Sequence, residues 1–296
     1  MNRSMDFGFF VVAYIDLQGQ TNELKRFQSA FRRWPANDAE KREFLERAEP
    51  IWGRVRSFRD AVNDLREIMC RPIPIPESIK VQAGQEYLAL CEKYAIRSVG
   101  VQFIGDAALL KVPLRTDYSP LPSIWSLLDQ LAIHALYSIG YGRPIRGGVE
   151  VGICSEIESN DLYGAAVSEA YFLESTVAEY PRIVIGNQLL EYLDTRQHSG
   201  GSQAEQDFIL SIVQKIREML ALDTDGHQIL SYLRPAVLSA LEDPQGVREC
   251  VAAASRFIAG EIEKFERLRD SDFKKLVERY LRLKRYFQDS GCWIET

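Results

Sequence analysis

Two aspartates, each placed where an apolar run ends or folds back, are the residues of this sequence best suited to chemistry. Asp16 closes the run 9–15, and Asp106 follows Gly105 in the middle of the run 99–112. The second run predicts two short strands folded back on each other, because glycine adopts the backbone conformations that tight hairpin turns require. If the first strand lies beside this hairpin, the two carboxylates meet at one edge of a sheet. Paired carboxylates either hold hard cations or repel each other, although a carboxylate can also do no more than end a strand.

The segments that must position these aspartates predict an α+β fold. β-Branched and aromatic runs indicate strands, and apolar residues three or four apart indicate helices. The order is strand, helices, hairpin, helix, strand, helix, strand. This is a ferredoxin-like plan with helices on one face of the sheet and a helical insertion, at about 36–95, in its first crossover. The predicted strands are 7–15, the hairpin 99–112, 146–154 and 182–186, and the predicted helices are 23–33, 36–70, 82–95, 124–139, 165–178 and 188–193.

Two polar or proline-rich stretches divide the chain. Three prolines make 71–78 extended, because proline fixes one backbone angle and lacks an amide hydrogen. The polar stretch 194–202 is the best internal boundary. It separates a domain at 1–200 from a mostly helical extension at 201–296, which carries a short hairpin at about 219–233. Apolar residues at helical spacing near the C-terminus indicate a packing surface, for which a partner chain is one candidate.

Composition and charge narrow the class of protein. The 296 residues carry a net charge of −6, which argues against general binding to nucleic acid or to anionic membranes. The first residues lead directly into a strand, and no apolar run approaches the roughly 18 residues of a membrane span, so we expect neither a signal peptide nor a transmembrane helix. Five scattered cysteines favour free thiols, and three distant histidines show no metal-ligand spacing. We therefore expect a cytoplasmic protein.

Five short motifs follow one another around the two aspartates. They are Asp-Leu-Gln-Gly-Gln-Thr at 16–21, Ile-Gly-Asp-Ala at 104–107, Arg-x-Gly-Val-x-x-Gly at 146–152, the stretch from Asp161 to Glu174, and Ile-Val-Ile-Gly at 183–186. This succession resembles the catalytic domain of the class III nucleotidyl cyclases, the family of the adenylate and guanylate cyclases. The resemblance covers about 7–193 and leaves the helical insertion unmatched.

The resemblance implies how a nucleotide would be held. Asp16 and Asp106 correspond to the carboxylates that bind two divalent cations, Mg²⁺ or Mn²⁺. The backbone amides around Leu17, Gly19 and Thr21 correspond to the loop that cradles the substrate phosphates at the start of a helix. In the first of these motifs Gln replaces the aromatic residue that is usual before the Ser or Thr.

The resemblance also assigns the base-reading and transition-state positions. Gln102 stands where adenylate cyclases carry a purine-reading lysine, and Asp161 stands where they carry its aspartate partner. The transition-state asparagine and arginine correspond to Ser168 and Phe172, so a cation is missing where phosphoryl charge must be stabilised. Gln102 with Asp161 is typical of neither adenine nor guanine readers. A pyrimidine base therefore stays open, as in the stand-alone pyrimidine cyclases of bacterial antiphage signalling.

The activity implied by the resemblance is the conversion of a nucleoside triphosphate, with UTP and CTP among the candidates, to a 3′,5′-cyclic nucleotide and pyrophosphate. Family sites form between two such domains, which implies a homodimer. Two alternatives stay open. One is a catalytically silent protein of the cyclase fold that binds nucleotide or a partner, which Ser168 and Phe172 favour. The other is an interaction protein that works through its helical C-terminal third.

Overall fold

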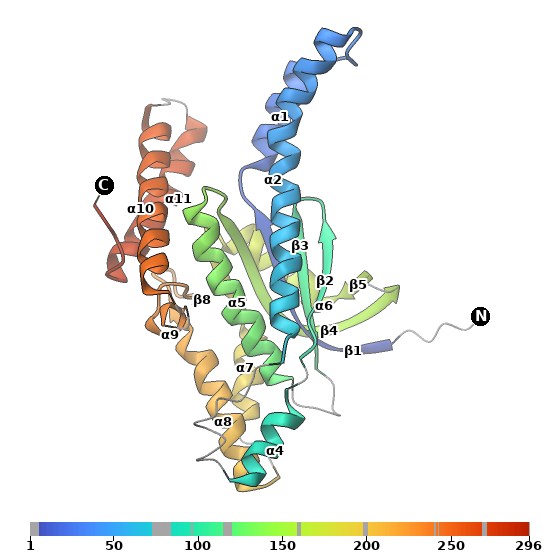
Figure 1. Ribbon diagram of the computed structural model, residues 1–296, viewed down its shortest axis with the longest axis vertical. Coiled ribbons are helices and arrows are strands. Elements are labelled where there is room, and N and C mark those ends of the chain that lie inside the picture. The colour runs from blue at the N-terminus through green and yellow to red at the C-terminus, as the bar shows by residue number, and fades with distance from the viewer. Residues whose placement is uncertain are drawn as a thin grey trace, which may run out of the picture.

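Helices and strands are mixed along the chain in the computed structural model (Figure 1). It describes residues 6–72, 84–95, 97–114, 120–158, 161–197, 201–239, 241, 243–267 and 271–295, with the side chains of 6, 21, 22, 158 and 271–273 left aside. Most of the predicted proline-rich stretch 71–78 and the middle of the predicted boundary 194–202 lie outside the described residues.

The strands form one mixed eight-stranded sheet. They are β1 (Asp6–Leu17), β2 (Gly100–Ile104), β3 (Ala107–Pro113), β4 (Ile145–Glu158), β5 (Asp161–Gly164), β6 (Ile183–Ile185), β7 (Leu220–Leu222) and β8 (Gln228–Leu230). Their order is β2-β3-β1-β4-β6-β8-β7, and β5 pairs with β4 outside this path. The pair β4 and β6 is parallel, and the other pairs are antiparallel.

β1 is a central strand, as its apolar run predicts. Every residue from Phe10 to Ile15 is buried, because both faces of this part of the sheet are covered. At its end Asp16 pairs with Ala107 of β3 on one side and with Arg146 of β4 on the other. The predicted hairpin is present as β2 and β3. Asp16 therefore lies next to the turn of that hairpin.

The helices surround the sheet and include a long one in the insertion. They are α1 (Gln20–Ala30), α2 (Asp38–Cys70), α4 (Gln85–Lys93), α5 (Leu121–Gly140), α6 (Ala165–Phe172), the π-helical turn η1 (Leu173–Val177), α7 (Asn187–Arg196), α8 (Gln203–Glu218), α9 (Pro235–Leu238), α10 (Pro244–Arg267) and α11 (Ser271–Asp289). None of the described helices is long and apolar enough to cross a membrane.

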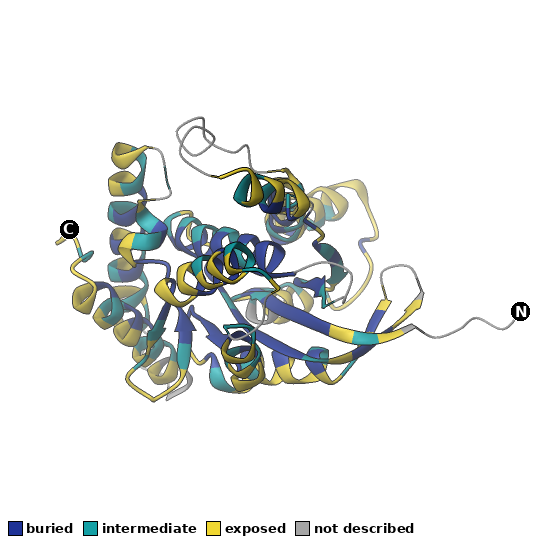
Figure 2. Cartoon of the chain, turned by 90° about the horizontal axis from the view of Figure 1, so that it is seen from below, coloured by how far each residue is buried: buried dark blue, intermediate teal, exposed yellow. Residues whose placement is uncertain are grey.

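The prediction that helices cover one face of the sheet is wrong. Alternate residues of β1, such as Val11 and Ala13, belong to the main core with α2 and α5. The intervening residues, such as Val12, form a second core with Ala166 of α6 on the opposite face. Figure 2 shows the buried strands between helices on both sides.

Two glycines of β4 explain why α6 can lie on that second face. A Cβ atom at Gly148 would stand 2.3 Å from the carbonyl oxygen of Ala170, and one at Gly152 would stand 2.9 Å from the backbone nitrogen of Ala166. Glycine therefore lets the backbone of α6 lie almost directly on the strand. Both glycines belong to the sequence motif at 146–152, but their spacing alone does not show on which face of the sheet a helix can pack.

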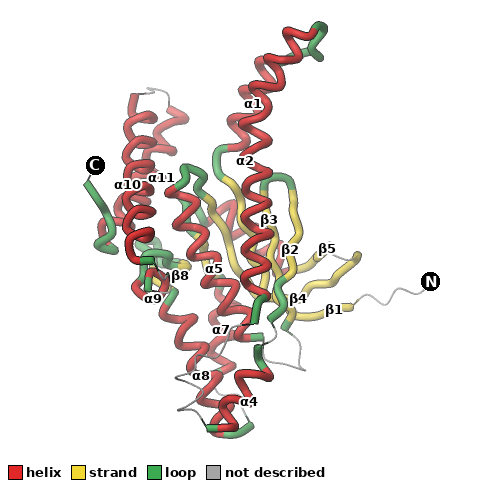
Figure 3. The backbone as a smooth tube through the Cα atoms, viewed as in Figure 1, coloured by secondary structure: helices red, strands yellow, loops and turns green. Residues whose placement is uncertain are grey.

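The C-terminal part of the chain joins the same sheet. The hairpin predicted at about 219–233 is present as β7 and β8, and β8 pairs with β6. α10 packs against α5 and α11, and the three helices lie side by side in Figure 3. Leu230 and Ile258 belong to the main core together with Val11, so residues from both sides of the predicted boundary share one core.

α1 and the part of α2 before Pro50 form an arm that extends beyond the sheet (Figure 1). Its two helices are held together by aromatic rings: the Phe27 ring centroid lies 5.0 Å from that of Phe31 and 5.0 Å from that of Phe44. At the tip Trp34 is 77% exposed. α1 begins directly after the end of β1, so this arm starts beside Asp16.

Candidate functional site

The two predicted aspartates are brought together at the end of β1. The backbone N–H of Leu17 donates to the carbonyl oxygen of Asp106 at 3.4 Å, which ties β1 to the turn of the β2–β3 hairpin. The Asp16 side chain is only 23% exposed. Burial, and then the negative charges of Glu174 and Asp106, raise the pKa of Asp16 to about 7. The negative charges of Glu174 and Asp106 therefore add to the effect of burial and make the Asp16 carboxyl group harder to ionise.

Glu174 completes an acidic cluster with Asp16 and Asp106, although the sequence reasoning gave it no role. Its side chain is 2% exposed, and the Nε atom of Arg146 lies 2.5 Å from its Oε1 atom. The same guanidinium places Nη2 at 3.7 Å from Oδ2 of Asp16. Burial raises the pKa of Glu174, and the charge of Arg146 opposes that rise. One arginine against three carboxylates leaves the cluster suited to binding a cation.

The close approach at Gly148 is what brings Glu174 to this edge. A Cβ atom at Gly148 would stand 2.5 Å from the Cβ of Leu173 and 3.0 Å from the backbone nitrogen of Glu174. Glycine thus allows η1 to settle on β4, two residues beyond Arg146. A buried glutamate that ends a helix motif is the only sequence signal for this contact, and it does not identify the partner.

The loop predicted to cradle phosphates agrees with the structure only in part. The amide of Leu17 donates to the carbonyl oxygen of Asp106, and its side chain is buried, so the assignment of Leu17 to substrate binding stays a prediction. The amide of Gln18 donates to the Pro144 carbonyl oxygen at 3.0 Å. Gly19 has φ 93°, a left-handed conformation that suits glycine, and α1 begins after it. The first turn of α1 offers the backbone N–H groups that lack intrahelical partners.

Two further residues bear on this turn of α1. The side chain of Thr21, a predicted phosphate-loop residue, lies outside the described part of the structure. Gln20 is 2% exposed, and neither polar atom of its side-chain amide has a hydrogen-bond partner among the described residues. Sequence reasoning had treated Gln20 only as a departure from the aromatic residue of the motif. A buried, unsatisfied amide at the start of a helix is unusual and marks this turn as a place where a polar ligand can be held.

The predicted base-reading residues contact each other. Nε2 of Gln102 donates to Oδ1 of Asp161 at 3.2 Å, and Oε1 of Gln102 accepts from the backbone N–H of Leu162 at 3.1 Å. The amide of Gln102 is therefore held at both ends and cannot rotate freely to present either group. What remains for a ligand is its second N–H donor and the other carboxylate oxygen of Asp161.

Neither residue at the two predicted transition-state positions carries a charge. Ser168 is exposed on α6, and no hydrogen bond joins its side chain to another described residue. Phe172, at the end of the same helix, is 50% exposed and brings no charge. Lys111 is buried on the neighbouring strand but forms an ion pair with Glu156. Neither Phe172 nor the paired Lys111 therefore supplies a free positive charge where the resemblance assigns an arginine.

A residue of the insertion also reaches the site. Arg59 of α2 donates to the carbonyl oxygen of Gly105, the residue before Asp106. This contact could not be predicted from the sequence. The periodicity of apolar residues identifies the buried face of α2, but it does not identify the contacts of an arginine outside that face.

The donor set fits hard divalent cations that are completed by a ligand. Asp16 and Asp106 supply two carboxylates, and Mg²⁺ is commonly held by one or two carboxylates together with substrate phosphates and water. Within the described ranges, no group of three or more histidine, cysteine, aspartate or glutamate residues is placed to hold a metal alone. Glu174 belongs to the cluster but is engaged by Arg146.

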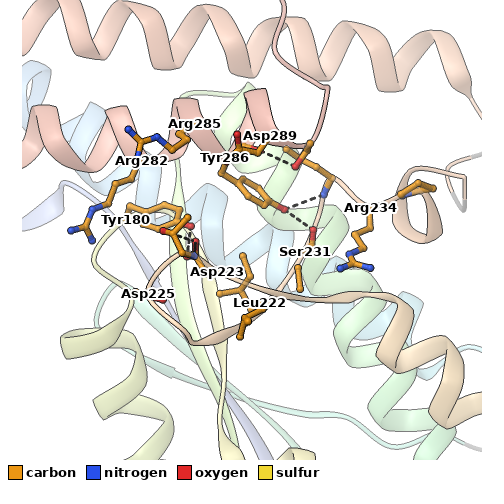
Figure 4. Close-up of a pocket in the computed structure, with 16 residues that line it drawn as sticks. Tyr180, Leu222, Asp223, Asp225, Ser231, Arg234, Arg282, Arg285, Tyr286 and Asp289 are labelled. Carbon is orange, nitrogen blue, oxygen red and sulfur yellow. Dashed lines mark hydrogen bonds between the residues drawn. The ribbon is translucent and has the colours of Figure 1, made fainter.

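A cavity of about 650 Å³ lies between the β7–β8 hairpin and α11, and none of the predicted site residues lines it (Figure 4). Some of its polar groups pair with one another, and Arg234 and Arg285 line it as exposed cations. The hydroxyl of Tyr180 donates to Asp223 at 2.6 Å, and the hydroxyls of Ser231 and Tyr286 lie 2.8 Å apart. Arg282 pairs with Glu179 outside the cavity. These contacts stabilise the wall of the cavity, and we assign the cavity no function.

No family model, curated protein or solved structure matches this chain, so its function has to be argued from its residues and their geometry.

Proposed function

We propose that the protein is a metal-dependent nucleotidyl cyclase similar in plan to the class III cyclases. The observation that carries this proposal is the hydrogen bond between Gln102 and Asp161, which are 59 positions apart in the sequence. The resemblance alone assigned these residues to one base-reading pair, and composition gave no reason to expect them in contact. A chance alignment would have no reason to bring them together.

The arrangement of the central strands supports the same proposal. β2, β3, β1 and β4 lie in this order, with every neighbouring pair antiparallel. This is the order of the split βαβ, or ferredoxin-like, plan. The acidic cluster lies where β1 ends beside the β2–β3 turn, which is where the proposal needs its two metal ligands.

In this proposal Asp16 and Asp106 hold the divalent cations, and the first turn of α1 binds the triphosphate. Bound cations would activate the ribose 3′-hydroxyl and neutralise charge on the leaving pyrophosphate. The 3′-hydroxyl loses its proton to solvent, its oxygen forms a bond to the α-phosphorus, and the bond from that phosphorus to the oxygen shared with the β-phosphate breaks, which releases pyrophosphate. Arg146, held by Glu174, keeps the Asp16 carboxylate in place at this edge.

The base would meet Gln102 and Asp161. With Gln102 fixed by Leu162, the pair presents one N–H donor and one carboxylate acceptor. Adenine, cytosine, uracil and guanine each carry a donor next to an acceptor, so this pair by itself permits more than one base. We propose UTP and CTP as substrates alongside the purine nucleotides, and a role in bacterial antiphage signalling follows only if the product is a cyclic pyrimidine nucleotide.

One observation favours the alternative, a catalytically silent protein of the cyclase fold that binds nucleotide. Phe172 stands where the resemblance places a transition-state arginine, and it supplies no charge. Arg146 is close to Asp16 but is engaged by Glu174 at 2.5 Å. If no cation from a partner subunit serves, the protein would bind nucleotide without converting it.

The proposal includes a homodimer. On α6, which lies on the face of the sheet that carries the acidic cluster, Tyr171 and Phe172 are each at least half exposed. Exposed aromatic residues grouped near a site are common where a partner covers them. Light scattering at micromolar concentration is expected to give twice the mass of the chain, and the mass of one chain would contradict this part of the proposal.

The activity is tested by incubating the purified protein with ATP, GTP, CTP and UTP separately, with Mn²⁺, and measuring cyclic nucleotide and pyrophosphate. At least one substrate should give both products in equal amounts. Asp106→Asn should give none, whereas Asp64→Asn, at an exposed position of α2, should match the wild type. Nucleotide binding without product from any of the four would replace the proposal by the silent alternative.

A further inference from the structure

A second cavity, of about 390 Å³, lies on the other side of the sheet from the acidic cluster. It opens between α2 and α5, beside the end of β1 and the start of β4. Leu17 lines it, and because side chains alternate along a strand, the neighbouring Asp16 points to the opposite face. The volume is within the roughly 300–1,000 Å³ of small-molecule sites. This cavity is independent of the proposed cyclase activity.

The floor of the cavity is apolar and firmly built. Leu17, Phe58 and Ile145 line it and are 3%, 4% and 2% exposed. All three belong to the main core, so their positions are fixed by packing rather than by the cavity itself. A ligand that enters would therefore meet a preformed apolar surface, which favours a molecule with an apolar, ring-sized body.

One wall carries a polar atom that the protein does not satisfy. Nε2 of His134 is buried and has no hydrogen-bond partner among the described residues. Its ring lies 6.3 Å from that of Phe58. Burial lowers the pKa of His134 to about 4, so the imidazole is neutral near pH 7. Buried polar atoms are nearly always paired, so an unpaired nitrogen in a residue that lines the cavity is unusual.

The charged residue at the opening of the cavity determines which kind of ligand the cavity favours. Arg143 is exposed and is the only charged residue among those that line the cavity, all of which are described. No ion pair joins it to another residue in the described parts of the chain. An unpaired guanidinium beside an apolar cavity attracts an anion, and it binds a carboxylate with two parallel hydrogen bonds when geometry allows.

We propose that this cavity binds a small organic anion with an apolar ring, whose acid group pairs with Arg143 and whose ring rests on Leu17, Phe58 and Ile145. Such a ligand would lie beside His134, which is one of the residues that line the cavity. A neutral molecule of the same shape would lose the contact with Arg143.

The test uses benzoate as the probe and benzamide as its neutral counterpart of the same shape. Histidine side-chain signals in the NMR spectrum report directly on the cavity, because the chain has only three histidines and the His134→Gln variant identifies the signal of His134. Benzoate should shift the His134 signal in a saturable way, and benzamide should bind at least about tenfold more weakly, a difference typical of losing one charged contact.

Three variants test whether benzoate binds in this cavity rather than elsewhere on the protein. Arg143→Gln should weaken benzoate at least about tenfold, while Arg234→Gln, an exposed arginine at the larger cavity of Figure 4, should leave it unchanged. Ala61→Phe, which places a ring in the cavity, should abolish binding. Thermal unfolding checks that each variant is folded. Equal binding of benzoate and benzamide, or equal binding by wild type and Arg143→Gln, or no shift of the His134 signal, would overturn the proposal.

Discussion

The guanidinium of Arg59 donates a hydrogen bond of 2.6 Å to the carbonyl oxygen of Gly105, across 46 positions of the sequence. The same group lies over the ring of Phe103, 5.2 Å from its centroid. Both contacts hold the turn of the β2–β3 hairpin from the side of α2, and Asp106 is the next residue. The insertion, which the cyclase resemblance leaves unmatched, therefore helps to position one of the two proposed metal ligands.

Arg59→Ala should weaken Mn²⁺ binding about tenfold, as the loss of groups that orient metal ligands usually does. The reason is that the Gly105 carbonyl loses its donor and the turn that carries Asp106 gains freedom. Titration of Mn²⁺, followed by electron paramagnetic resonance, measures the affinity. Arg56→Ala, at an exposed position of the same helix, is the matched control. Equal affinities in the two variants would show that Arg59 has no part in positioning Asp106.

The acidic cluster predicts how stability depends on pH without metal. The folded protein raises the pKa of Asp16 from 3.8 to about 7, so between these values the folded state binds this proton more tightly than the unfolded state. The free energy of unfolding should therefore fall as pH rises from about 4 to about 7 and level off above. Asp16→Asn should remove this dependence and raise the free energy of unfolding at pH 8 by about 1–2 kcal/mol.

Urea unfolding at pH 5 and pH 8, with Asp64→Asn as the control, measures this effect. The two variants should differ at pH 8 and approach each other at pH 5. Metal binding should show the opposite trend and strengthen as pH rises through about 7, because the proton and the cation compete for the same carboxylate. A stability difference that is the same at both pH values would contradict the raised pKa.

Removing Arg146 should destabilise the protein more than removing its partner. Arg146→Met leaves the buried carboxylate of Glu174 without its counter-charge, which typically costs about 3–5 kcal/mol. Glu174→Gln keeps a polar group of the same shape and should cost less. In the double variant the loss should be smaller than the sum of the two single losses, which urea unfolding at pH 7 can measure. Additive losses would mean that the 2.5 Å contact does not couple them.

Gln102→Lys should move nucleotide preference toward ATP by at least about tenfold in relative turnover or binding. A lysine beside Asp161 recreates the pair that adenylate cyclases use for adenine. Gln102→Met removes the hydrogen bonds at similar size and should lower discrimination without favouring ATP. Relative turnover or competition binding with the four nucleotides gives the result. An unchanged preference in Gln102→Lys, with Mn²⁺ binding retained, would remove Gln102 from the site.

The parts of the site that depend on strand ends were predictable from the sequence. Asp16 and Asp106 sit at positions where an apolar run stops or turns, and such positions fall at a sheet edge whichever way the helices pack. The resemblance assigned Gln102 and Asp161 to one pair, and their side chains are joined by a hydrogen bond in the structure.

The parts of the site that depend on the close approach of a helix to a strand could not be predicted from the sequence. The position of α6 on the second face follows from what a Cβ atom would meet at Gly148 and Gly152, which requires knowing the neighbouring backbone. The contact between Arg146 and Glu174 depends on the same approach. Arg59 lies in a segment whose periodicity describes its buried face only, so the reach of its side chain to Gly105 has no sequence signature.

Pro50 lies inside α2, between the arm and the portion of the helix that packs on the sheet. Proline has no amide hydrogen, and its ring crowds the carbonyl group four residues earlier, so a helix yields most easily at such a residue. α1 spans this proline, because Glu23 pairs with Arg54 and the Phe27 ring lies 5.3 Å from that of Trp52, so α1 splints α2 across Pro50. A load applied at the tip of the arm, where Trp34 is exposed, is therefore carried past Pro50 by α1 toward the part of α2 that holds Arg59.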